Sequence, residues 1–241
     1  MVNQTVTLAG LSNREFLETY ARPGRVGLVG GSTPIEKVIR RAERHVDAEK
    51  RWSLWSHSFV FGERRLDDHF WIIESDLHIA RKHIRLGVQE NRLSKYFDEA
   101  TFTTLAVLDF GLAEEQVKSL LREGLELVAQ RARYSIRELV GTFIALRKPE
   151  LRGEENLLAR EESFYCSAFV QHLFSKIGFD LAPGVHGKNT TPEDLSRSPV
   201  PHITYLLKRG MDRGKLQRLG VRLRRRIRAR LKHLKGSEAD G

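Results

Sequence analysis

The chain has 241 residues, of which 40% are hydrophobic and 30% charged, which is the composition of a soluble globular protein with a sizeable core. Its single cysteine excludes an intramolecular disulfide framework and fits a reducing compartment. No stretch of 18 consecutive apolar residues is present, and the first 16 residues lack the basic start and apolar run of a secretory signal. We therefore expect a cytoplasmic protein without a membrane-spanning segment.

The net charge of +10 is concentrated at the C-terminal end. Residues 207–241 carry 13 of the 41 Lys/Arg and 3 of the 31 Asp/Glu, whereas residues 1–206 balance at 28 of each. The main part of the chain thus gives no electrostatic reason to expect a polyanionic partner. We predict one main domain over residues 1–206 and a basic tail over residues 207–241.

The N-terminal third predicts a short helix or loop at 12–20 and a short apolar run at 25–29. A capping-box pattern from Thr33 to Glu36, with proline at the first helical position, then predicts a helix to about His45. The glycines at positions 30 and 31 follow neither the phosphate-loop nor the dinucleotide-binding spacing. Nucleotide binding at this turn is therefore disfavoured.

Two aromatic-rich runs, 52–61 and 70–75, predict a β-hairpin joined by a polar connection at 62–69. The period of two places Trp55, His57, Phe59 and Phe61 on one face of the first strand. If the connection is symmetric, His57 lies directly opposite Glu74, with Cβ atoms about 4.5–5.5 Å apart. A one-residue change of register would separate the two side chains.

The remaining segments are predicted from periodicity and turn residues. Residues 76–95 suggest a mixture of helix and loop, with His78 and His83 on a helix surface. A strand is expected at 101–110, a helix at 113–131, a helix or extended run at 134–146, a charged connector at 149–162, and a capped turn from Thr191.

The only cysteine, Cys166, begins an apolar segment with helical spacing that ends near Gly178. A thiol in the first helical turn faces unpaired N–H groups and the positive end of the helix dipole, which favours the thiolate. Taken alone, a cysteine in an apolar helix is more often a small core residue. A nucleophilic role requires a base nearby.

His57 and Glu74 supply that base in the predicted hairpin. A carboxylate beside one imidazole nitrogen supports the protonated ring and leaves the other nitrogen for a nucleophile. The alternative is a cross-strand ion pair on a solvated face, against which the aromatic neighbours on the same face argue. Cysteine, histidine and an acid are the parts of a thiol hydrolase, here in the order His57, Glu74, Cys166.

The segments WSHSFVF, IIES and YCSAFVQHLF, in this order, resemble the circularly permuted papain-like hydrolases of the NlpC type. The likeness is greatest to the YiiX/YebB-like permuted amidases, which are related to lecithin:retinol acyltransferases, and it covers residues 20–200. The resemblance implies an α+β fold in which an antiparallel sheet or half-barrel packs against helices, with the nucleophile at a helix N-terminus. It implies Cys166 as nucleophile, His57 as base and then acid, Glu74 as orienting group, and Tyr165 lining the pocket. Two positions depart from that branch: Ala168 replaces a common acidic residue, and Arg25 follows Gly24 where aspartate is frequent.

The implied chemistry is acyl transfer from an amide or ester through a thioester, without cofactor or metal. The remaining histidines have no metal-ligand spacing, and His172 lies on the far side of the helix from Cys166. The backbone N–H of Cys166 is the expected oxyanion donor. We expect a peptide or lipid-like substrate, and no obligate protein partner is inferred.

Leucines and isoleucine at steps of three and four, with arginines between them, predict a basic amphipathic helix over residues 211–235. Such a helix can pack on its own domain, lie on an anionic membrane, or bind nucleic acid or a protein. Three functions remain open from the sequence. They are a thiol amidase or peptidase, a lipid-directed acyltransferase or phospholipase brought to membranes by the tail, and a non-catalytic binding module on the same fold.

Overall fold

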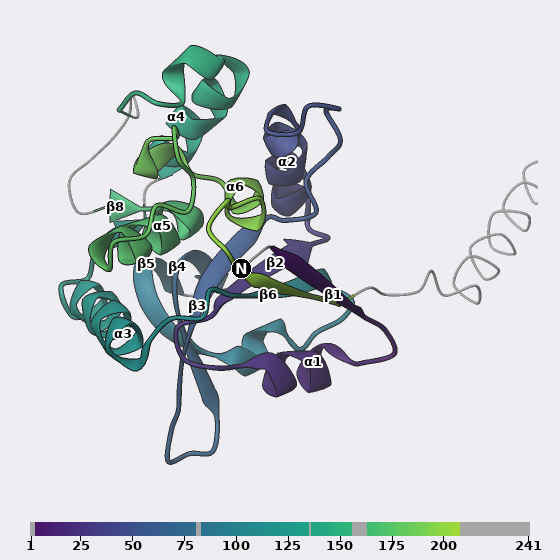
Figure 1. The fold of residues 1–241 in the computed structure, drawn as a ribbon, viewed down its shortest axis with the longest axis vertical. Coiled ribbons are helices and arrows are strands. Elements are labelled where there is room, and N and C mark those ends of the chain that lie inside the picture. The colour runs from purple at the N-terminus through teal and green to yellow at the C-terminus, as the bar shows by residue number, and fades with distance from the viewer. Residues whose placement is uncertain (1–2, 81–82, 135, 156–162, 208–241) are drawn as a thin grey trace, which may run out of the picture. The chain divides into compact units, whose positions relative to one another are not determined.

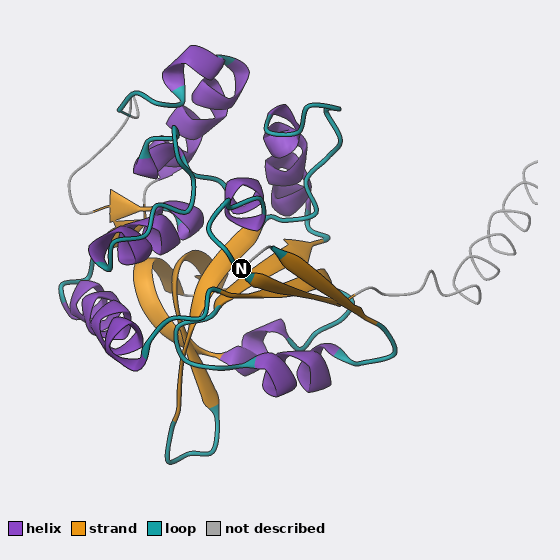
Figure 2. Cartoon of the chain, in the orientation of Figure 1, coloured by secondary structure: helices purple, strands orange, loops and turns teal. Residues whose placement is uncertain are grey.

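A seven-stranded mixed sheet forms the centre of the computed structural model, with helices on both of its faces (Figure 2). The structure describes residues 3–80, 83–134, 136–155 and 163–207. The strand order is β1 (Gln4–Leu8), β9 (Ile203–Leu207), β6 (Phe102–Asp109), β2 (Val26–Gly31), β3 (His57–Arg64), β4 (Phe70–Ala80) and β5 (His83–Arg92). Neighbouring strands are antiparallel except β1 and β9, which are parallel. The predicted α+β class is confirmed, although the sheet is mixed rather than antiparallel throughout.

The described part of the chain contains six α-helices (Figure 1). They are α1 (Asn13–Tyr20), α2 (Pro34–Ala42), α3 (Glu114–Ala129), α4 (Ile136–Arg147), α5 (Cys166–Lys176) and α6 (Pro192–Ser196). Short 3-10 turns lie at η1 (Glu43–His45), η2 (Leu93–Tyr96), η3 (Pro149–Leu151) and η4 (Gly187–Asn189), and β7 (Arg133–Tyr134) pairs in parallel with β8 (Ser163–Phe164). Among the described residues, no helix is both long and apolar enough to cross a lipid bilayer.

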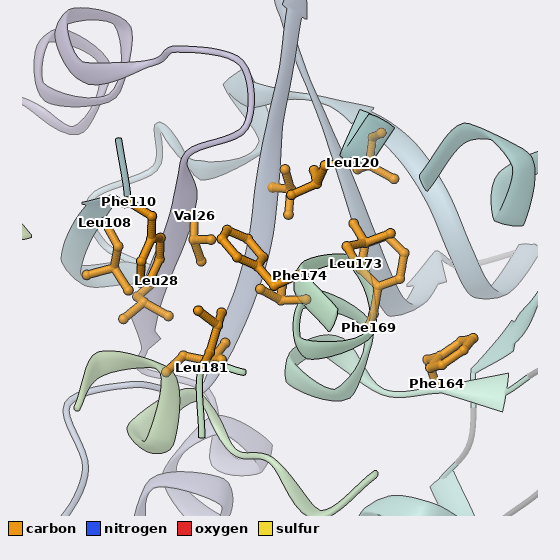
Figure 3. Close-up of a cluster of buried hydrophobic side chains, with 14 of the residues drawn as sticks. Val26, Leu28, Leu108, Phe110, Leu120, Phe164, Phe169, Leu173, Phe174 and Leu181 are labelled. Atoms are coloured by element: carbon orange, nitrogen blue, oxygen red, sulfur yellow. The ribbon is translucent and has the colours of Figure 1, made fainter. Parts of the chain in front are cut away.

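The sheet separates two hydrophobic clusters. On one face, α3 and α5 pack through side chains such as Leu120, Phe169 and Phe174 against the strands (Figure 3). On the other face, α1 and η2 pack through Phe16, Leu93 and others. Alternate residues of a strand point to opposite faces, so adjacent positions of the central strands contribute to both clusters.

The predicted capping boxes are present. The hydroxyl of Thr33 accepts from the backbone N–H of Glu36 at the start of α2, and the hydroxyl of Thr191 accepts from that of Asp194 at the start of α6. Side-chain oxygens at these positions satisfy N–H groups that a helix start leaves unpaired. Both helices therefore begin where the sequence pattern places them.

Two sequence-based assignments need correction. Residues 76–95 are not a mixture of helix and loop, because β4 continues to Ala80, β5 follows, and His78 and His83 lie in these strands. The first hairpin strand begins at His57 rather than at residue 52, and Trp55 packs in the cluster with α5, not in that of Phe59. The segment 134–146 is predicted as a helix or an extended run, and both are present. Tyr134 is the last residue of β7, and α4 begins at Ile136.

The chain divides into residues 1–208 and 209–241. The second unit is outside the described residues, as is most of the predicted tail at 207–241. The predicted basic helix at 211–235 therefore remains a prediction. Everything that follows concerns the first unit.

Gly27 in β2 leaves room for the ring of Phe59, its cross-strand partner in β3. A Cβ atom at this position would lie 2.3 Å from the ring of Phe59, which stacks on Tyr96 with centroids 4.8 Å apart. Because neither buried ring can move freely, we expect Gly27→Ala to lower the free energy of unfolding by about 1–3 kcal/mol. Urea unfolding measures this, with Gly153→Ala as control, where the nearest atom is 3.4 Å away. Equal urea midpoints for the two variants would contradict the packing described.

Candidate active site

Cys166 is the first residue of α5, directly after the N-cap residue Tyr165. No side chain caps this helix start, so its first N–H groups are not satisfied by a capping oxygen. The thiol is buried, with 7% of the residue exposed, at the positive end of the helix dipole. The predicted position of the cysteine at a helix N-terminus is confirmed.

His57, the first residue of β3, is hydrogen-bonded to Cys166, and the backbone of Ser58 also hydrogen-bonds the cysteine. Burial opposes a charged imidazole, but the neighbouring thiolate and the carboxylate of Glu74 outweigh it and raise the pKa of His57 to about 10. Burial likewise opposes the thiolate, but the charge and hydrogen bond of His57 and the Ser58 backbone lower the pKa of Cys166 below its ordinary value. Both shifts favour the form of the pair in which the sulfur is a thiolate and the ring an imidazolium.

Glu74, in β4, is completely buried and binds the other ring nitrogen of His57. The distance from Nε2 of the imidazole to Oε2 of the carboxylate is 2.7 Å, which leaves Nδ1 as the nitrogen that faces Cys166. Burial would raise the pKa of Glu74, but Lys95 and His57 hold it well below its ordinary range. The carboxylate therefore stays ionised and fixes the orientation of the ring.

Three further donors surround the same carboxylate, all from β5 and η2. Asn91 Nδ2 lies 2.7 Å and Lys95 Nζ 2.6 Å from Oε1 of Glu74, and the hydroxyl of Tyr96 donates to Oε2. Lys95 also bridges to Asp76. A buried carboxylate is stable only when its lone pairs are satisfied, and these donors meet that requirement. The sequence analysis did not identify them because it assigned residues 76–95 to helix and loop.

The predicted cross-strand pair of His57 and Glu74 needs a correction of register. The structure pairs Val60 with Ile73 and Phe61 with Ile72, so that continuing the ladder places Glu74 beside Phe59. The ladder is thus shifted by two residues from the predicted one, which keeps every side chain on the same face. His57 and Glu74 consequently meet as diagonal neighbours on that face.

A hydrogen bond joins β4, the strand of Glu74, to the residue two positions before Cys166. The hydroxyl of Ser75, directly after Glu74, donates to the carbonyl of Phe164 at 2.6 Å, and both residues are buried. Because Phe164 is two residues before Cys166, this bond sets the position of the α5 N-terminus relative to β4.

Tyr165 is 1% exposed, and its hydroxyl forms hydrogen bonds to other residues of the protein. It donates to the carbonyl of Thr190 and accepts from the hydroxyl of Thr142 in α4 at 3.1 Å. Ser167, on the other side of Cys166, donates to the same carbonyl at 2.7 Å. Both neighbours of Cys166 are thus fixed by hydrogen bonds to Thr190, and contact of Tyr165 with a substrate stays a prediction.

Glu43, in η1, is a second buried acid near the thiol that the sequence analysis did not identify. Burial raises the pKa of Glu43 well above the ordinary value, although a hydrogen bond from Ser53 acts in the opposite direction. The negative charges of Glu193, Cys166 and Asp194 raise the pKa further. Its Oε2 atom accepts from the backbone N–H of Glu193 at 3.1 Å. These effects favour the uncharged form of Glu43.

His172, on the same helix as the cysteine, binds a different acid. Its Nε2 atom lies 2.8 Å from Oε1 of Glu123 in α3, and its ring packs 4.8 Å from that of Phe164. The structure therefore gives this histidine a partner of its own between α3 and α5. It serves below as the matched control for His57.

Comparisons with protein-family models and with curated proteins find no match to this chain. What Cys166, His57 and Glu74 can do must therefore be inferred from their geometry. That geometry places a buried thiol of lowered pKa beside an imidazole, with a buried carboxylate behind the ring. These are the groups that covalent catalysis at a carbonyl carbon requires.

Proposed function

We propose that the protein is a thiol-dependent hydrolase, of the amidase or peptidase type, that cleaves an amide bond through a thioester on Cys166. The observation that carries the proposal is the hydrogen-bonded pair of Cys166 and His57, with the buried carboxylate of Glu74 2.7 Å behind the ring. An isolated buried cysteine would keep its proton, because burial disfavours the thiolate. The protein instead surrounds this one with groups that stabilise its charge.

In the proposed reaction, the sulfur of Cys166 attacks the carbonyl carbon and forms a C–S bond, and the negative charge moves to the carbonyl oxygen. The backbone N–H of Cys166 is the proposed donor to that oxyanion. When the C–N bond breaks, the imidazolium of His57 gives its proton to the departing nitrogen. Water then attacks the thioester, His57 takes its proton, and the acid product leaves with the thiolate restored.

The pKa directions define a pH window for this reaction. Thiolate is lost as the pH falls through the pKa of Cys166, which lies below its ordinary value. The proton for the leaving group is lost as the pH rises through the pKa of His57, about 10. Acylation by an amide should therefore be fastest between these two values.

For the fold, we propose the circularly permuted papain-like arrangement of the YiiX/YebB-like amidases. The order of the three residues along the chain and the cysteine at the start of a helix support this assignment. The proposed site also requires a reduced thiol, which suits a reducing compartment such as the cytoplasm.

An acyl-enzyme experiment tests the proposed chemistry. With p-nitrophenyl acetate in excess, the protein should release a burst of about one equivalent of p-nitrophenolate. Mass spectrometry should place an acetyl group on the peptide that contains Cys166, and Cys166→Ser should remove both signals. A protein that releases no burst and gains no acetyl group would instead be a non-catalytic binding module on the same fold.

A further inference from the structure

Helices α2 and α4 present matching stripes of side chains to one shared hollow. Val38, Arg41 and Ala42 follow helical spacing on α2, and Phe143 and Arg147 do so on α4. These residues, with Arg44 and His45 of η1, line an open hollow of about 410 Å³. Both helices rise on the same side of the sheet as α6 (Figure 1). We call Val38, Arg41, Arg44, Phe143, Ile144 and Arg147 the α2–α4 face.

The α2–α4 face is strongly positive. Among the described residues, Arg41, Arg44 and Arg147 form no ion pair with a carboxylate, unlike most arginines of the sheet and its loops. The lining of the hollow contains no acidic residue. Burial, followed by the charges of Arg44, Lys50 and Arg147, lowers the pKa of His45, as expected where positive charges are not neutralised.

The same face exposes large apolar side chains. Val38 is 60%, Val140 46% and Ile144 38% exposed, and the last two continue the α4 stripe through Phe143. Trp52, 52% exposed, lies beneath the guanidinium of Arg41, with the ring centroid 5.9 Å from Cζ. Exposed apolar side chains clustered in this way mark a binding surface, whereas single ones do not.

This face adjoins the candidate active site at two points. Arg44 directly follows Glu43, whose buried carboxyl has its pKa raised in part by the nearby Cys166. Phe143 directly follows Thr142, whose hydroxyl bonds the hydroxyl of Tyr165. Any surface that contacts the α2–α4 face is therefore held next to the helix that carries the nucleophile.

We propose that the α2–α4 face docks on an anionic lipid bilayer, with Val38 and Ile144 entering the interface and the three arginines meeting the headgroups. Arginines alone would suit any polyanion. Exposed aliphatic side chains stabilise a complex only where binding removes them from water. A bilayer interface can bury them in this way, whereas a nucleic acid backbone cannot. The docking would present membrane-borne substrates to Cys166, but it does not depend on the proposed chemistry.

Vesicle sedimentation with the full-length protein tests the docking. All proteins carry Cys166→Ala, so thiol chemistry cannot alter the lipids, and all retain the basic segment 208–241. On vesicles of phosphatidylcholine with phosphatidylglycerol, Arg41→Gln/Arg147→Gln should weaken partitioning about thirtyfold, and Val38→Ser/Ile144→Ser at least about tenfold. The matched controls Arg122→Gln/Arg131→Gln and Leu66→Ser/Leu125→Ser change exposed residues elsewhere and should bind like the parent protein.

Two results would overturn the proposal. In the first, the face variants partition onto the vesicles as strongly as their matched controls. In the second, Arg41→Gln/Arg147→Gln weakens binding to a single-stranded oligonucleotide but leaves vesicle binding unchanged, which would assign the face to nucleic acid. Circular dichroism of each variant confirms that it is folded before its binding is compared.

Discussion

Replacing His57 by alanine should slow the alkylation of Cys166 by iodoacetamide at pH 7 by roughly thirtyfold or more, because an unassisted thiol with a pKa of about 8.5 is only a few per cent thiolate there. The variant loses the hydrogen bond and the positive charge that lower the pKa of Cys166. Burial, which remains, raises that pKa further. Cys166 is the only cysteine, so the incorporated label reports on this site alone.

His172→Ala is the control for this measurement. His172 lies on the helix of Cys166 but binds Glu123, so its loss should leave the alkylation rate near that of the unchanged protein. Equal rates for His57→Ala and the unchanged protein would show that His57 does not activate the thiol.

Replacing Glu74 by glutamine should have the largest effect on stability, about 3–5 kcal/mol of the free energy of unfolding. The carboxylate accepts hydrogen bonds from four side chains, those of His57, Asn91, Lys95 and Tyr96. A glutamine amide has only one acceptor oxygen, and its NH2 group would point at some of these donors instead of accepting from them. His57 then loses the carboxylate behind its ring, and Lys95 keeps only Asp76 as its counter-charge. Urea unfolding measures the loss, and the pKa of His57 should fall in the same variant.

Glu123→Gln provides the matched comparison. It also replaces a carboxylate that is paired with a histidine, but the side chains of His172 and Glu123 are each about a quarter exposed. Solvent screens such a pair, so the expected loss is below about 1 kcal/mol. If Glu74→Gln costs no more than Glu123→Gln, the cluster around Glu74 does not hold the site together.

Local patterns in the sequence predicted the parts of the site that depend on a single element. Helical spacing after Cys166 located α5, and the capping boxes at Thr33 and Thr191 located two further helix starts. The period of two placed His57 and Glu74 on one face. The two side chains lie on one face although the predicted strand register was wrong by two residues, because a shift by an even number of residues keeps each side chain on the same face of the sheet.

The parts that were missed depend on contacts distant in sequence. Ile84, Leu86 and Val88 alternate with other residues as in a strand, but the charged residues around them obscured this signal. Without β5, the donors that follow it could not be brought to Glu74. The parallel pairing of β1 with β9 joins residues 199 positions apart, and no local pattern encodes such a pairing.

The central claim is that Cys166 and His57 form a thiolate–imidazolium pair in the folded protein. The ultraviolet absorbance of the thiolate, recorded as a function of pH for the unchanged protein and for Cys166→Ala, tests it most directly. The difference between the two should titrate below the ordinary thiol pKa of about 8.5. In His57→Ala its midpoint should move above that value. A midpoint at or above the ordinary pKa in the unchanged protein would contradict the claim.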